Sequence, residues 1–264
     1  MNYNEVYANL KKEGKIAFVP FTILGFPNYD TSLEIIKTMI ENGADILELG
    51  LPFSDPVADG PIIQKANNIT LNNGINTESC FQLLEDIRKV SNIPIGLLIY
   101  ANLIYSYGVE KFYAKLSELK INSVLIPDIP PEESEEYNQV AAKYGVKTVF
   151  IITPITPKDR MKKICDMTTG FIYLISRMGI TGTHQSASTD LKSTIQQIKE
   201  FSNIPINVGF GISQPEHFIN LKSVGADGGI IGSAIIKLIQ KYQGNLKELK
   251  LRLSEYLLSI CEVK

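Results

Sequence analysis

The sequence contains no tryptophan, only two histidines and only three cysteines among its 264 residues. The cysteines (Cys80, Cys165 and Cys261) are far apart and form no Cys-x-x-Cys pair, which argues against a disulfide framework or a zinc site. We therefore expect a reducing, intracellular environment. The histidines, His184 and His217, are too distant in sequence to suggest a local metal motif, and His217 is interpreted as a helix-surface residue.

The sequence also lacks an excess of charge and any long apolar run. Its 26 basic and 28 acidic side chains give a formal net charge of −2, so no basic face for nucleic acid is predicted. No stretch of about 18 uninterrupted apolar residues is present, so no membrane span is predicted. The N-terminal residues have no apolar signal core. We expect a cytoplasmic protein, or a stromal one if the gene is plastid-encoded.

Short β-branched runs alternate with longer amphipathic stretches along the whole chain. The runs are almost continuously apolar, which predicts parallel strands buried on both faces, at residues 16–23, 45–49, 95–100, 123–127, 146–151, 171–176, 205–210 and 228–232. Helical periodicity and capping residues predict helices at residues 29–42, 77–90, 109–119, 131–144, 157–165, 188–201, 214–224, 233–239 and 245–260.

Eight strand–helix units with no linker predict a single (β/α)₈ TIM barrel over residues 1–264. We expect an extra N-terminal helix before the first strand and a short helix after the eighth. A doubly wound open sheet is the alternative architecture, but its G-x-G-x-x-G fingerprint after the first strand is missing.

Carboxylates lie within and just after the second predicted strand. Glu48 lies inside an apolar run, where an acid is costly unless its charge is used or its pKa is raised. The loop that follows carries Asp55 and Asp59. Because functional groups of such a barrel collect at the C-terminal ends of its strands, Glu48 and Asp59 could form an acid–base pair. Alternatively, Glu48 faces solvent or an ion-pair partner, and Asp59-Gly60-Pro61 is only a turn before a helix.

Glycine-containing segments follow the last three predicted strands, at residues 179–183, 209–213 and 232–234. Glycine lets the backbone approach a ligand closely, and the helix that begins near Ser233 offers free N–H groups. Together these segments favour a phosphate ligand at the usual barrel phosphate site, although glycine is also common in ordinary turns. Aromatic residues near the strand ends, Phe21, Tyr100, Tyr173 and Phe210, could line a pocket for a flat apolar substrate, or could simply be core.

The segment LELGLPFSDPVADGP at residues 47–61 resembles the signature of the tryptophan synthase alpha chain family. The resemblance extends over essentially the whole chain, through YANLIYSYG (100–108), SVLIPDIPPEES (123–134), FIYLISRMGITG (171–182), NVGFGIS (207–213) and GGIIGSAIIK (228–237). The least similar stretch is residues 183–188, in the loop after the sixth predicted strand.

The resemblance implies a lyase of tryptophan biosynthesis that cleaves indole-3-glycerol phosphate by a retro-aldol reaction. The products are indole and glyceraldehyde 3-phosphate. It implies Glu48 as the general acid–base, Asp59 as its assistant at the indole nitrogen, and Tyr173 beside them. The implied substrate-binding residues are Phe21, Leu98, Tyr100 and Phe210 for indole, and Gly182, Gly211, Gly232 and Ser233 for phosphate.

The resemblance also implies a partner, the tryptophan synthase beta chain, in an alpha-beta-beta-alpha heterotetramer with indole channelled between allosterically coupled sites. Asp55 and its neighbours Pro52, Phe53 and Pro56 are the implied contact. No metal or organic cofactor is expected in this chain, because pyridoxal phosphate belongs to the partner. The alternatives are a free-standing indole-releasing lyase, a catalytically idle phosphate-sensing barrel and a phosphosugar isomerase.

Overall fold

The structure, a computed structural model, describes residues 2–175, 184–209 and 211–264, with the backbone alone for residues 184–190. Eight parallel strands form a closed barrel in chain order, and β8 pairs with β1. They are β1 (Ala17–Ile23), β2 (Leu47–Gly50), β3 (Ile95–Leu98), β4 (Ser123–Leu125), β5 (Lys147–Ile152), β6 (Ile172–Ile175), β7 (Ile206–Gly209) and β8 (Gly228–Ile231). The predicted TIM barrel is confirmed.

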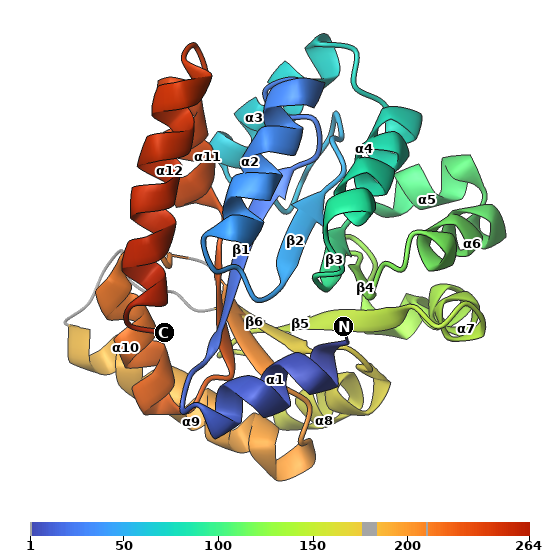
Figure 1. The fold of residues 1–264 in the computed structure, drawn as a ribbon. Coiled ribbons are helices and arrows are strands. Elements are labelled where there is room, and N and C mark those ends of the chain that lie inside the picture. The colour runs from blue at the N-terminus through green and yellow to red at the C-terminus, as the bar shows by residue number, and fades with distance from the viewer. Residues whose placement is uncertain (1, 176–183, 210) are drawn as a thin grey trace.

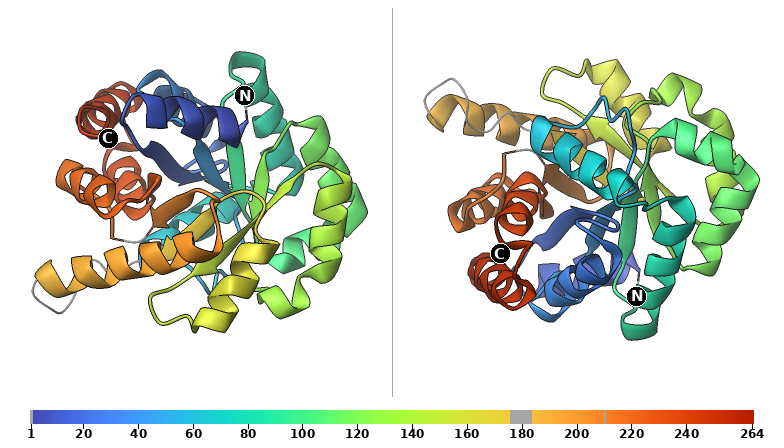
Figure 2. Two further views of the ribbon diagram at one scale, coloured as in Figure 1. Left: turned by 90° about the horizontal axis from the view of Figure 1, so that it is seen from below. Right: turned by 90° about the horizontal axis from the view of Figure 1, so that it is seen from above.

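Helices surround the barrel (Figures 1 and 2). They are α1 (Tyr3–Lys12), α2 (Tyr29–Glu41), α3 (Pro61–Asn72), α4 (Thr77–Val90), α5 (Ala101–Tyr107), α6 (Val109–Glu118), the 3₁₀ turn η1 (Pro131–Glu133), α7 (Glu135–Lys143), α8 (Lys158–Met167), α9 (His184–Phe201), α10 (Pro215–Val224), α11 (Ser233–Tyr242) and α12 (Leu246–Cys261). Within the described ranges, none of them is long and apolar enough to cross a membrane.

The structure differs from the sequence-based expectation in three helical segments. The single helix predicted over residues 131–144 was wrong, because the chain forms η1 first and α7 begins only after Ser134. Of two further helices, α5 was not predicted, and for α3 only a start after the turn at Asp59-Gly60-Pro61 was considered. In α3 the apolar pattern is interrupted by asparagines, and α5 is only seven residues long. Both follow strands at the C-terminal end of the barrel, so both lie at the end that carries the candidate site.

Burial explains why the strands read as continuous apolar runs. All seven residues of β1 and all four of β2 are buried, because the barrel interior covers one face and the helices cover the other. Glu48 is the only acid among the buried residues in the described part of the chain. In register it lies beside Phe21 of β1 and Gly96 of β3.

Helix α1 closes the N-terminal end of the barrel (Figure 2, left), which confirms the expected extra helix. It begins at a capping box in which Asn2 and Glu5 satisfy each other's backbone N–H groups. Two of its tyrosines make buried bonds to strand residues. The Tyr3 hydroxyl lies 2.7 Å from Ser123 Oγ, and Asn207 Nδ2 donates to the Tyr7 hydroxyl at 2.7 Å. These two bonds attach α1 to strands on different sides of the barrel, β4 and β7.

Candidate active site

Glu48 lies in β2 and its side chain is almost completely buried, with only 3 % of the residue exposed. No cation lies close enough to form an ion pair with it among the described residues. Burial raises the pKa of Glu48 to about 8, and the nearby Asp59 carboxyl adds to the increase. The solvent-facing interpretation is therefore wrong, and the ion-pair interpretation finds no partner in the part of the chain that the structure describes. A carboxyl group of this kind exchanges a proton near neutral pH, as a general acid–base requires.

Asp59 lies in the loop between β2 and α3, immediately before the Gly60 cap and Pro61 at the first helical position. Its Oδ2 lies 3.4 Å from Asn67 Nδ2, and its carboxyl also accepts from the Tyr100 hydroxyl. Burial raises the pKa of Asp59 to about 6, while these two hydrogen bonds favour the ionised form. The two carboxyl groups thus have unequal pKa values, with Asp59 the first to lose its proton.

The loop between β2 and α3 is tied to the barrel by two of its neighbours. Asn67 of α3 accepts the Phe53 N–H at 3.0 Å through Oδ1. The Tyr100 hydroxyl accepts the Ala58 N–H at 3.2 Å, and the Tyr100 ring stacks on Phe53 with 5.0 Å between centroids. The same two side chains therefore shape the loop and contact the Asp59 carboxyl, which fixes that carboxyl relative to the barrel.

Tyr173 of β6 lies close enough to both carboxyl groups for their charges to act on its hydroxyl. Burial raises the pKa of Tyr173 well above its ordinary value, and Glu48 and Asp59 add to the increase. The phenol therefore stays protonated and available as a hydrogen-bond donor. Its ring covers Gly209 of β7 so closely that any Cβ there would overlap it. Gly209 therefore provides the space that holds Tyr173 beside the carboxyl pair.

Replacement of Gly209 by alanine is expected to destabilise the protein by about 1–3 kcal/mol, the usual cost of overpacking a filled core. The methyl group has no free space unless the Tyr173 ring moves. The measurement is the free energy of unfolding from urea titration. Gly244→Ala is the matched control, because nothing lies within 4 Å of a Cβ at that position. Equal stability of the two variants would contradict the packing described for Tyr173.

Phe21, a predicted indole-pocket residue, packs against Gly232, a predicted phosphate residue. A Cβ on Gly232, in the turn between β8 and α11, would lie 3.0 Å from Phe21 Cδ1, and one on Gly50 would lie 3.2 Å from its Cζ. The turn that precedes α11 therefore packs directly on the aromatic ring from β1. Leu98, at the end of β3, is the register neighbour of Gly50, so it belongs to the same end of the barrel.

The predicted phosphate residues are partly described. Gly232 caps α11 without a side-chain hydrogen bond, and Ser233 begins the helix. The first backbone bond of the helix runs from Ile236 N–H to Gly232 C=O, so the N–H groups before it have no acceptor within the helix. Gly211 is exposed and has φ of +78°, a conformation that favours glycine. Gly182 and Phe210 lie outside the described residues.

The predicted partner contact divides into exposed and buried residues. Asp55 is exposed, whereas Pro52 and Pro56 are buried within this chain and Phe53 is half-buried under its contact with Tyr100. Val57 in the same loop is 78 % exposed. The exposed face of this loop is therefore formed by Ser54, Asp55, Val57 and Ala58, while the prolines shape the loop from inside.

Sequence reasoning missed Asn67, because an asparagine in a helix normally faces solvent. The feature that could have revealed it is its position in α3, where it interrupts the apolar face of the helix. Asn67 is 1 % exposed and uses both ends of its amide, whereas its neighbour Asn68 is exposed. His217 was also misjudged in part. It lies on α10 as expected, but it is half-buried and its Nδ1 accepts the Ser213 N–H at 3.1 Å.

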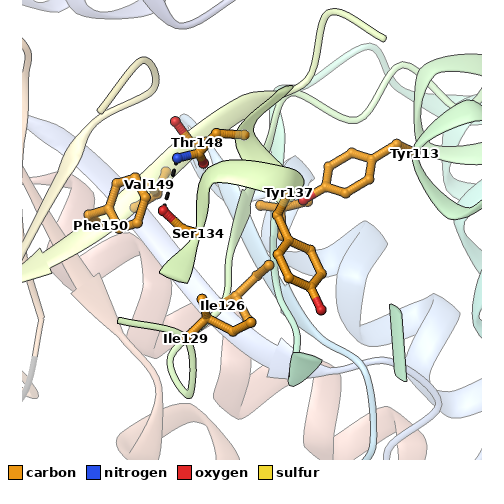
Figure 3. Close-up of a pocket in the computed structure, with 10 residues that line it drawn as sticks. Tyr113, Ile126, Ile129, Ser134, Tyr137, Thr148, Val149 and Phe150 are labelled. Atoms are coloured by element: carbon orange, nitrogen blue, oxygen red, sulfur yellow. Dashed lines mark hydrogen bonds between the residues drawn. The ribbon is translucent and has the colours of Figure 1, made fainter. Parts of the chain in front are cut away.

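A separate cavity lies between the outer face of β4 and β5 and helices α6 and α7 (Figure 3). Its lining is mainly apolar, with the Tyr137 ring beside it and Asn138 donating to Ser134 Oγ at 2.9 Å. None of the predicted site residues lines it. Across the described ranges, no group of three or more His, Cys, Asp and Glu residues is arranged to hold a metal ion.

Comparison with known proteins identifies the family of this chain. A model of the tryptophan synthase alpha chain family matches residues 7–260. The tryptophan synthase alpha chain of Methanothermobacter thermautotrophicus is 44 % identical over 253 residues, which cover 96 % of this chain and 92 % of the relative. That of Francisella tularensis is 43 % identical over 248 residues, covering 94 % and 92 %.

Solved structures show the same likeness. Tryptophan synthase subunit alpha of Legionella pneumophila superposes with a TM-score of 0.90 at 29 % identity, covering 100 % of this chain and 98 % of the other. A chain from the tryptophan synthase a2b2 complex of Pyrococcus furiosus superposes with a TM-score of 0.86 at 34 % identity, covering 94 % of this chain and 99 % of the other. Sequence and fold agree, and the chain belongs to the tryptophan synthase alpha chain family.

Proposed function

We propose that this protein is the alpha subunit of a tryptophan synthase and cleaves indole-3-glycerol phosphate to indole and glyceraldehyde 3-phosphate. The observation that carries the proposal is the buried Glu48 carboxyl, with its pKa raised to about 8, beside Asp59 at the C-terminal end of β2. Membership of the family supplies the reaction, and the geometry gives each of these two carboxyl groups a distinct chemical role.

Glu48 serves as acid and then as base. At neutral pH it carries a proton, because burial raises its pKa to about 8, and it gives this proton to C3 of the indole ring. The resulting carboxylate accepts the proton of the side-chain hydroxyl. The bond between C3 and the side chain then breaks, its electrons return to the ring, and the hydroxyl carbon becomes the aldehyde. One proton enters and one leaves, so Glu48 ends as it began.

Asp59 acts while the ring carries positive charge. With a pKa of about 6 it is ionised at neutral pH, and its carboxylate can accept from the ring N–H as charge develops there. The bonds from Tyr100 and Asn67 hold it in the ionised form and in place. The Tyr173 hydroxyl donates a hydrogen bond to the substrate or to the Glu48 carboxylate beside it.

The rest of the substrate is bound by the residues around Phe21. The indole ring lies among Phe21, Leu98, Tyr100 and Phe210, and the phosphate is bound by backbone N–H groups at Gly182, Gly211, Gly232 and Ser233. The contact between Gly232 and Phe21 supports this arrangement, because it joins the two halves of the site. Backbone N–H groups explain how a chain of net charge −2 binds a phosphate.

The partner in this proposal is the tryptophan synthase beta chain, in an alpha-beta-beta-alpha heterotetramer. Exposed apolar side chains in segments that follow β2, β3 and β5 support it, namely Val57, Tyr105 and Ile155, which are 78, 72 and 87 % exposed. All three lie at the C-terminal end of the barrel, where Asp55 is also exposed. The proposed cleavage uses no cofactor, and pyridoxal phosphate belongs to the partner.

The remaining assignments are a single domain over residues 1–264 and a cytoplasmic location, or the stroma for a plastid-encoded chain. The closed barrel that runs from β1 to β8 supports the single domain. The bacterial and archaeal origin of the relatives supports the cytoplasm.

The test is release of indole from indole-3-glycerol phosphate by the purified chain, with and without the beta chain. Turnover that increases on addition of the beta chain is the expected result. High turnover with no such increase would favour a free-standing lyase. No turnover in either condition would favour an idle phosphate-sensing barrel and would overturn the proposal.

The dependence of the reaction on pH follows from the two carboxyl groups. Because Asp59 must be ionised and Glu48 protonated, kcat/KM is expected to rise as pH increases through about 6 and to fall as pH increases through about 8. Steady-state assays between pH 5 and 9 with constant ionic strength would measure the profile. A flat profile over this range would exclude these roles.

A further inference from the structure

The loop between β7 and α10 is held at one residue by two side chains from different helices. The Ser213 N–H donates to Nδ1 of His217, in the first turn of α10, at 3.1 Å. The Tyr256 hydroxyl, from α12, donates to the Ser213 C=O at 2.9 Å. Both peptide groups that flank Ser213 are therefore fixed, one from within the loop's own helix and one from a helix 43 residues further along the chain.

Neighbouring residues leave the loop little remaining freedom. Ile212 is 4 % exposed and anchors the loop in the core. Gly211, the preceding residue, has φ of +78° and is exposed. With Ser213 and Ile212 held, the direction of the backbone at Gly211 is set by contacts within the protein.

Capping of α10 explains only half of this arrangement. The orphan groups at the start of a helix are N–H groups, and an acceptor such as His217 can satisfy one just before the helix. The Gln214 cap makes no side-chain bond of its own, and His217, in the first turn, accepts the N–H of Ser213, the residue before the cap. The Tyr256 bond goes to a carbonyl outside the helix, which no helix start requires. Burial raises the pKa of Tyr256, so its hydroxyl remains a donor.

We propose that His217 and Tyr256 are positioning residues that hold the loop at Gly211–Ser213 in its phosphate-binding conformation. The inference rests on the proposed function, which assigns Gly211 to the phosphate. A backbone held in its bound conformation loses little entropy when the ligand binds, so the two bonds increase affinity without touching the ligand. Neither residue lies beside the carboxyl pair, so the chemical step does not depend on them.

The test compares two probes of the assembled enzyme, inhibition by glycerol 3-phosphate and inhibition by indole. In Tyr256→Phe and in His217→Leu, we expect KM for indole-3-glycerol phosphate and Ki for glycerol 3-phosphate to rise about three- to tenfold, the effect of one hydrogen bond. We expect kcat and the Ki of indole to stay within about twofold, since the bonds act only on the phosphate half.

Two further variants separate positioning from structure. His217→Asn keeps an acceptor at the position of Nδ1 and should restore Ki for glycerol 3-phosphate toward the wild-type value. Tyr242→Phe removes a hydroxyl from the same groove between α11 and α12 without touching Ser213, and should behave as wild type. Unchanged KM and Ki in Tyr256→Phe and His217→Leu, or equal weakening of both probes, would overturn the inference.

Failure of the proposed function would give a different result. Wild-type enzyme would then release no indole, and the loop would be tested by direct calorimetric titration of inorganic phosphate. Weaker phosphate binding by Tyr256→Phe than by Tyr242→Phe would still support the inference. Equal binding by these two variants would overturn it.

Discussion

Glu48→Gln is expected to lower kcat for indole release by about 10²–10⁴-fold, the usual contribution of a general acid–base residue. Glutamine has nearly the same shape but can neither give a proton to C3 nor take one from the hydroxyl. Substrate affinity should be retained, because the phosphate and indole contacts come from other residues. The measurements are single-turnover indole release and the dissociation constant of the substrate. Turnover near the wild-type rate would refute the role assigned to Glu48.

The same substitution should change stability in a pH-dependent way. In the unfolded chain a glutamate ionises near pH 4.5, whereas Glu48 in the folded protein keeps its proton to about pH 8. The folded state therefore binds more protons between these values, and the wild-type free energy of unfolding falls as pH rises across them. Between pH 5 and pH 9 the free energy of unfolding of the wild type should fall by about 3–5 kcal/mol more than that of Glu48→Gln.

Urea unfolding of both proteins at the two pH values measures this difference. A variant that is inactive yet gains relative stability at high pH would show that the buried carboxyl is retained for chemistry and not for folding. Parallel loss of stability in the two proteins would mean that Glu48 has no raised pKa in the folded state.

Asp59→Asn is expected to lower kcat/KM by about 10²-fold, the effect of removing one electrostatic partner of the transition state. The amide has no charge to balance the positive ring. The substitution should also shift the high-pH limb of the activity profile to lower pH, because the Asp59 charge contributes to the raised pKa of Glu48. The low-pH limb, which reports ionisation of Asp59, should disappear.

Asn68→Asp provides a control for this variant, since it alters charge at an exposed position of α3, next in sequence to Asn67. Its pH profile should match that of the wild type. If the high-pH limb of Asp59→Asn stays where it is in the wild type, the two carboxyl groups do not interact as described. Loss of substrate binding in Asp59→Asn would instead indicate that the loop between β2 and α3 has changed its conformation.

The strands were predictable because burial on both faces requires a run of consecutive apolar residues in the sequence. A strand such as β1 must be apolar at every position, so its place could be recognised without any knowledge of its neighbours. Helices α3 and α5 were less visible. The first buries Asn67 and Thr70 where an apolar stripe is expected, and the second is too short for a period to emerge.

The break between η1 and α7 has a similar cause. Residues 131–144 have a proline start and acidic residues in the first turn, which is typical of a continuous helix. In the structure the Ser134 hydroxyl donates back to Pro131 C=O and accepts from Asn138, which satisfies the backbone around a tight turn. Such local competition between side chain and backbone is not visible in a hydrophobic pattern.

By itself the sequence determined the barrel, the acid inside β2 and the family motif around Asp59, because each is a local pattern of residue types. Only the tertiary structure decided that no cation of the described residues lies beside Glu48, that Asn67 and Tyr100 hold Asp59, and that Ser213 is bound from both α10 and α12. A pKa depends on the total burial and charge around a group, and these are contributed by residues far apart in sequence. For that reason Glu48 could be proposed as the acid–base residue from the sequence, whereas its protonation state could not be predicted.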